Sequence, residues 1–195
     1  MQKKTSRLQS WFGVQDMTVG RPMDSLVRFS IPLLVGNLAQ QLYNTVDSIV
    51  VGQYIGDTAL AAVGTAGPIL NLLLVLFMGI ATGASILSAQ YFGAHDRQHL
   101  SRVVGASILL TVSSSILMGF VGFFASPWLM SLVNPPADVL DGAVIYLQII
   151  FIGILGTATY NILAGVLRGL GDSLMPLVSL LVASLLNIVL DIVFV

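Results

Sequence analysis

The sequence contains no cysteine, few charged residues and only two histidines. Asp, Glu, Lys and Arg together make up 9% of its 195 residues. The lack of Cys excludes a disulfide framework and thiol chemistry, but it leaves the redox compartment open. Charged residues make up about 25% of an ordinary soluble domain. This shortage of charge therefore excludes an ordinary soluble protein.

Apolar residues take the place of the missing charges. They make up 56% of the chain, and the mean hydropathy is +0.93. Apolar runs of about 20 residues are long enough to cross a bilayer as helices. We therefore predict an all-α integral membrane protein, a polytopic helix bundle of about five spans. The amino-terminal segment is 1–27, and the spans cover about 28–51, 59–90, 103–125, 142–167 and 174–195.

The second of these runs is longer than a straight span requires. The chain is uncharged from Ala59 to Ala94, so we expect a helix that is tilted or broken, with a kink at Pro68. Gly79 and Gly83 form a GxxxG pair that permits close helix contact, although this motif is weak evidence in a chain with many glycines.

The cations are confined to alternate ends of the predicted spans. Each lies before span one, between spans two and three, or between spans four and five. They are Lys3, Lys4, Arg7, Arg21, Arg28, Arg97, Arg102 and Arg168. The other loops contain only acids, Asp57, Asp138 and Asp141. By the positive-inside rule, we predict a multi-pass protein of the inner or plasma membrane with its amino terminus in the cytoplasm.

The first span carries polar residues on one face. Asn37, Gln40, Asn44 and Asp47 recur at steps of three, four and three, so they share one side of a helix. A carboxylate at bilayer depth costs roughly 2.5–3.5 kcal/mol and usually marks an ion or substrate path. Asp47 lies about 28 Å beyond Arg28, so it could instead end the helix at the water interface. The polar residues below it favour a functional acid.

The fifth predicted span repeats this arrangement. Asn187 and Asp191 lie one turn apart, and Asp191 is as far from Asp172 as Asp47 is from Arg28. Both acids should then lie at similar depth. Their oxygens suit a hard cation, and two carboxylates in one pocket would also hold a proton. The alternative is that Asp191 is merely hydrated near the end of its helix.

Enzymatic chemistry has little support in the sequence. His95 and His99 are spaced to share a metal beside Asp96, but no further ligand is near, which favours a solvated turn. The spans contain no His, and no nucleophile and base in register. We therefore predict that the chain is not an enzyme and has neither an organic cofactor nor a nucleic-acid partner. A non-catalytic membrane assembly subunit remains an alternative.

Several segments together resemble one transporter family. They are YNTVDSIVVGQYIG, ALAAVG, GIATGASILSAQYFGA, YNILAGVLRGLGDS and LLNIVLDIVF. In this order they resemble the multidrug and toxic compound extrusion (MATE) family from about Gly20 to the end. The resemblance implies twelve helices in two lobes of six, related by a pseudo-twofold axis. It also implies export of drugs or other organic cations in exchange for sodium ions or protons.

The resemblance also implies roles for individual residues. Asp47 would bind the coupling ion with Asn187 and Asp191, and Pro32 would allow the first helix to bend. The expected substrate-cavity residues are Asn37, Gln40, Tyr43, Asn44, Thr157, Tyr160 and Asn161. The only metal expected is a coupling sodium ion.

The resemblance covers only part of such a transporter. The sequence stops inside its fifth span, so we expect a truncated amino-terminal lobe whose partners are the lipid bilayer, an organic cation and the missing carboxy-terminal lobe. Flippases of lipid-linked sugars have similar lobes and are an alternative function. They are expected to have several Arg or Lys in the cavity, and we expect none inside these spans.

Overall fold

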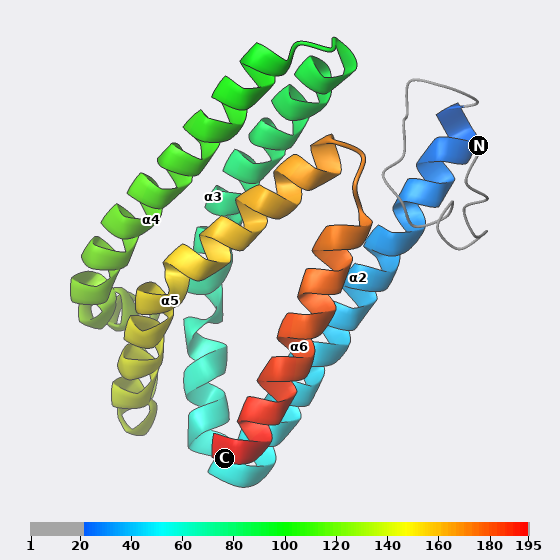
Figure 1. Cartoon of the computed structure of the whole chain (residues 1–195). Coiled ribbons are helices and arrows are strands. Elements are labelled where there is room, and N and C mark those ends of the chain that lie inside the picture. Colours follow the sequence, from blue (N-terminus) through cyan, green and yellow to red (C-terminus); the bar gives the residue numbers. More distant parts are fainter. Residues whose placement is uncertain (1–21, 195) are drawn as a thin grey trace.

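The computed structural model describes residues 22–194, so most of the predicted segment 1–27 lies outside the described residues. Within this range the chain forms a bundle of helices, which confirms the predicted fold class (Figure 1). The elements are α2 (Pro22–Val50), the short π-helix η1 (Val51–Ile55), α3 (Asp57–Gly93), α4 (Arg97–Val133), α5 (Ala137–Gly169) and α6 (Leu174–Phe194). By length and composition, α3, α4 and α5 are able to cross a membrane.

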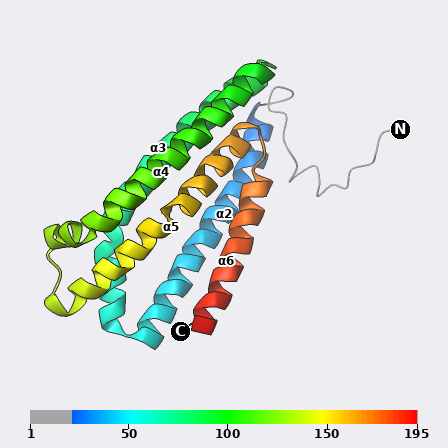
Figure 2. The same cartoon turned by 60° about the vertical axis from the view of Figure 1, so that its left-hand side comes forward.

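Turn residues set the ends of these helices. Gly56, with φ of 109°, separates η1 from α3, and glycine tolerates this backbone conformation because it has no Cβ. Asn134 ends α4 in the left-handed region, and two prolines follow it. The α5–α6 turn contains Gly171, with φ of 84°. Both views show α3 bent along its length, as expected of a helix with Pro68 in its interior (Figures 1 and 2).

The helices form two packing groups. Buried residues of α3 and α5 make the main hydrophobic core, with Phe77 and Phe151 among its largest members. α4 packs on both of these helices. α2 packs mainly on α6, where Gly36 lies against Leu177 and Leu180 (Figure 2). The first and last described helices therefore form one pair, which stands beside the α3–α4–α5 group.

Close contact between α3 and α5 depends on two glycines of α5. A Cβ added to Gly165 would lie 2.7 Å from the carbonyl oxygen of Ala81, and one added to Gly169 would lie 2.4 Å from that of Ser85. By contrast, a Cβ on Gly79 or Gly83 would meet nothing within 4 Å. The GxxxG spacing that brings helices together is therefore the one in α5.

Arg97, Arg102 and Arg168 lie at one end of the bundle. The α3–α4 turn, which precedes Arg97 and Arg102 of α4, lies at the same end as the α5–α6 turn, which follows Arg168 (Figure 1). Asp57 and Asp138, in the first turns of α3 and α5, lie at the other end. This arrangement is the one on which the positive-inside argument depends.

Asp96 caps α4 at the end that carries the cations. Its carboxylate accepts the backbone N–H of His99 at 3.1 Å and contacts Nδ1 of the same residue at 2.6 Å. The His99 ring also stacks on Tyr91. Hydrogen bonds from the His99 backbone and side chain lower the pKa of Asp96 below its usual value. The sequence left His99 without a structural role, and the structure gives it one in this turn.

We expect Asp96→Ala to loosen the first turn of α4. An ionised cap whose pKa is lowered by folding stabilises the folded state above its unfolded pKa, and this contribution is lost as the pH falls through the folded pKa. Hydrogen exchange at neutral pH should therefore be severalfold faster at residues 97–100 in the Ala variant, with a smaller change in Asp96→Asn. Asp138→Ala is the control. Asp138 also lies in the first turn of a helix, but the N-cap residue of α5 is Pro136, which makes no side-chain cap, so this variant should not change exchange at residues 97–100. Equal exchange in Asp96→Ala and the native chain would contradict this role.

Candidate functional site

A cavity of about 780 Å³ lies between the α2–α6 pair and helices α3 and α5. Its lining extends from Phe29 to Gln40 on α2, and from Ser173, just before α6, to Ala183 in α6. It therefore occupies the half of the bundle nearer the end that carries the cations. Several lining side chains, including Asn37 and Thr157, are exposed, so the cavity is open. A site of this size fits a small organic molecule.

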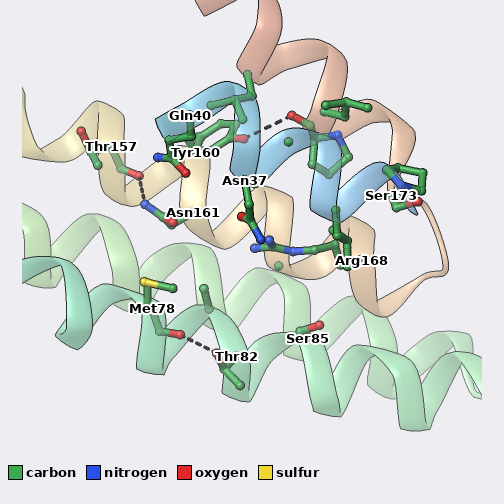
Figure 3. Close-up of a pocket in the computed structure, with 18 of the residues that line it drawn as sticks. Asn37, Gln40, Met78, Thr82, Ser85, Thr157, Tyr160, Asn161, Arg168 and Ser173 are labelled. Carbon is green, nitrogen blue, oxygen red and sulfur yellow. Dashed lines mark hydrogen bonds between the residues drawn. The ribbon is translucent and has the colours of Figure 1, made fainter. Parts of the chain in front are cut away.

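α2 contributes a backbone feature and two amides. Pro32 lies inside the helix, is fully buried and lines the cavity. Asn37 and Gln40 follow on the same face and also line it (Figure 3). Proline removes one backbone hydrogen bond from a helix, so α2 is locally weakened beside the cavity.

α5 contributes a second polar face. Thr157, Tyr160 and Asn161 line the cavity, as Figure 3 shows. The Asn161 amide donates to the Thr157 carbonyl at 2.9 Å. The Tyr160 hydroxyl donates to the Pro176 carbonyl of α6 at 3.2 Å. This last bond bridges α5 and α6 at the edge of the cavity.

α3 forms the remaining wall, and its surface is mixed. Met78, Thr82 and Ser85 are labelled there in Figure 3, between the apolar residues Leu74 and Ile86. The Thr82 hydroxyl donates a hydrogen bond to the Met78 carbonyl oxygen at 2.7 Å. The wall thus offers mainly apolar surface to a ligand.

Arg168 also lines the cavity, although it is not among the residues predicted from the sequence to do so. It belongs to the last turn of α5 and is half-buried. The predicted fourth span ends at residue 167, which places Arg168 in a loop, and the lack of cations inside the predicted spans argues against a flippase. The structure corrects that premise, because Arg168 belongs to α5 and lines the cavity. The available signal was spacing, because Arg168 lies eleven residues, three helical turns, after Thr157.

The predicted ion site lies about two helical turns beyond Gln40, toward the acidic end. Asp47 of α2 is half-buried there. In α6, Oδ1 of Asn187 is buried without a hydrogen-bond partner in the described part of the chain. A buried oxygen of this kind is uncommon and is available to a ligand.

The other predicted site residues lie elsewhere or are not described. Tyr43 is half-buried and Asn44 exposed, and neither is among the residues that line the cavity. The Asn44 amide faces Gln41 at 3.4 Å. Asp191 belongs to α6, but its side chain lies outside the described residues. No group of three or more His, Asp or Glu residues suited to a metal ion occurs among the described side chains.

Comparison with known proteins decides the family. The family model described as MatE matches residues 32–193, which include the predicted ion site and every lining residue of the cavity except Phe29. The chain belongs to the MATE family. Members of this family are multi-pass membrane transporters rather than enzymes, in agreement with the predicted class.

The MATE chain also resembles individual relatives. It is 35% identical over 180 residues to "Probable multidrug resistance protein YpnP" of Bacillus subtilis. The aligned region covers 92% of this chain and 40% of that protein. It is 31% identical to YoeA of the same organism, over 85% of this chain and 36% of that protein. A solved structure described as the outward-facing conformation of a multidrug resistance MATE family transporter matches 97% of this chain and 40% of its own, with 29% identity and a TM-score of 0.82.

The MATE chain therefore spans about 40% of the length of these relatives. The matched length agrees with the predicted amino-terminal lobe. The resemblance extends to the solved fold, because the TM-score was obtained over nearly the whole chain.

Proposed function

We propose that this chain is the amino-terminal lobe of a cation-coupled antiporter that exports organic cations across the plasma membrane, with its amino terminus in the cytoplasm. The observation that carries the proposal is the cavity between α2, α3, α5 and α6 in a MATE family chain. The names of its relatives refer to multidrug resistance, which supports drugs as the substrate class. A second lobe would complete the cavity, because alternating access needs two halves.

The coupling ion would bind beyond the cavity at Asp47 and Asn187. A carboxylate and an unpartnered amide oxygen suit sodium, and the carboxylate alone can hold a proton. Asp191 would add a second carboxylate. Asp47 lies about 10 Å along α2 from Gln40. The ion and the substrate would therefore bind at different depths along the α2–α6 pair.

Pro32 would let α2 change shape when the ion binds. Its missing hydrogen bond lowers the cost of bending there, and it lies on the substrate side of the ion site. A ligand shifts such a helix only if it binds one shape more tightly than the other. The weakened position lies at the level of the cavity, on the helix that also carries Asp47, and this supports the role.

Transport by the complete protein that contains this chain tests the proposal. Proteoliposomes are loaded with a fluorescent organic cation and given an inward sodium gradient or an inward proton gradient. We expect one gradient to accelerate dye efflux, and an ionophore that dissipates it to remove the acceleration. Efflux that is equally fast with and without both gradients would contradict coupling, and no efflux above protein-free vesicles would contradict this substrate class.

A flippase of lipid-linked sugars remains the second candidate because of Arg168. A cation in the cavity is a feature that a phosphate-bearing substrate requires. A flippase is nevertheless expected to use several cations, and Arg168 is the one charged residue that lines the described cavity.

A further inference from the structure

The charge of the cavity is concentrated at one point. Among the described residues that line it, Arg168 alone is charged. No acid in the described part of the chain lies within ion-pair distance of its guanidinium. Asp172, in the following turn, accepts the backbone N–H groups of Leu174 and Met175 at 3.0 and 3.1 Å. The nearby acid is thus engaged in capping α6 and forms no ion pair with Arg168.

Most donors of Arg168 are available to a ligand. A guanidinium has five N–H donors, and here Nε donates to the Ala164 carbonyl at 3.1 Å. The terminal nitrogens have no hydrogen bond to any described residue. Figure 3 shows the side chain extended across the cavity toward Asn37 of α2. The fork of terminal N–H groups is the arrangement that binds a carboxylate or phosphate with two parallel hydrogen bonds.

The position of Arg168 is set by the packing of α5 on α3. Gly165 and Gly169, on either side of it in sequence, contact the backbone of α3 so closely that neither has room for a Cβ. This contact fixes the rotation of α5 about its axis. Arg168 is therefore held on the cavity side of the helix rather than free to turn into water.

The surroundings of Arg168 are those of an amphiphile site. The cavity walls carry the aliphatic side chains Leu33, Leu74, Ile86, Leu177 and Leu180. Asn37 and the buried Ser173 lie at the polar end with Arg168. A ligand with one oxyanion and an apolar body would match both parts.

A purely structural role would be simpler. A cation near the carboxyl end of a helix stabilises the helix dipole, and Arg168 does so. That role needs only an exposed side chain. It does not account for a half-buried guanidinium that faces an apolar cavity.

We propose that Arg168 binds the carboxylate or phosphate of an amphiphilic ligand at this end of the cavity, with the Asn37 amide beside it. The proposal deepens the proposed function, on which it rests for the cavity as a ligand site. The occupant is either an anionic lipid headgroup or a soluble amphiphile, including a substrate that carries both charges.

Photolabelling of the complete protein tests the proposal. The probes are palmitic acid with a diazirine in its chain and the methyl ester of the same compound, in phosphatidylcholine nanodiscs. We expect the acid to label the cavity walls more strongly than the ester. Arg168→Gln should weaken labelling by the acid at least about tenfold, a loss of about 1.4 kcal/mol, because the charge-assisted hydrogen bonds to the oxyanion are lost. Labelling by the ester should not change.

Two further variants separate this site from general electrostatics. Arg102→Gln removes an exposed cation at the same end of the bundle and should leave labelling by the acid unchanged. Arg168→Lys keeps the charge without the fork and should be intermediate. Equal labelling of native protein by acid and ester, or equal losses in Arg168→Gln and Arg102→Gln, would overturn the proposal. The comparison of acid with ester in native protein decides even if Arg168→Gln does not fold.

Competition then identifies the occupant. If phosphatidylglycerol displaces the acid probe at mole fractions at which phosphatidylcholine does not, the site binds a lipid headgroup. If it does not displace the probe, the site binds a soluble amphiphile. Labelling does not require transport, so a protein that binds the acid but exports no dye would overturn the proposed function and not this site.

Discussion

Replacement of Asp47 by Asn should abolish gradient-driven export by the complete transporter. The substitution keeps the size of the side chain and removes the charge that would hold the coupling ion. A unit charge about 4 Å from a monovalent ion contributes roughly 4 kcal/mol at an effective dielectric constant of about 20. Because Asp47 is half-buried, we expect about half of this value, which corresponds to a loss of roughly thirtyfold in ion affinity.

The measurement compares efflux of a fluorescent organic cation with and without the driving gradient. Asp57→Asn is the matched control, since Asp57 is an exposed acid in the first turn of α3, at the same end of the bundle as Asp47. This control should export like the native protein. If Asp47→Asn retained gradient-dependent efflux at equal membrane abundance, Asp47 would be an interfacial residue and the coupling site would lie elsewhere.

Replacement of Gly165 by Leu should prevent correct packing of the bundle. Even a Cβ at this position would lie 2.7 Å from the Ala81 carbonyl oxygen, and backbone atoms cannot move aside as a flexible side chain can. Overpacking of a close contact costs roughly 1–3 kcal/mol, and a leucine requires far more space than a single methyl group. We therefore expect α5 to separate from α3, with loss of most of the folded protein.

Thermal unfolding of the detergent-solubilised protein, followed by size-exclusion chromatography, measures this effect. Gly153→Leu is the control, because a Cβ on Gly153 of the same helix meets nothing within 4 Å. It should leave the melting temperature close to that of the native protein. Similar melting of both variants would show that the α3–α5 contact tolerates a side chain.

Replacement of Gly165 by Ala should also weaken ligand binding at Arg168, since the contact of Gly165 with α3 fixes the rotation of α5.

The helices could be predicted from sequence because long apolar runs are interrupted by only a few turns. Gly56, Asn134 and Gly171 mark these turns, and their backbone conformations agree with their residue types. Helix pairing was not predictable in the same way. Two GxxxG motifs lie within α-helices, one in α3 and one in α5, and only contact geometry distinguishes the pair at Gly165 that packs closely.

The polar face of α2 was predictable in part. The three- and four-residue spacing groups Asn37 with Gln40, and both line the cavity, but it also includes Asn44, which lies beyond the lining. Periodicity gives the direction of a side chain and not the length of the cavity. Arg168 was missed for the opposite reason, because its charge suggested a loop although its spacing placed it on the face of Thr157.

The pairing of α2 with α6 also affects synthesis of the chain. About 120 residues separate the end of α2 from the start of α6. At roughly 5–20 residues per second, the ribosome needs on the order of ten seconds to add them. During this interval α2, with its amides and Asp47, has left the ribosome without its main partner in the bundle. Until α6 emerges, the polar side chains of α2 therefore have to be covered by the insertion machinery or by temporary contacts with α3.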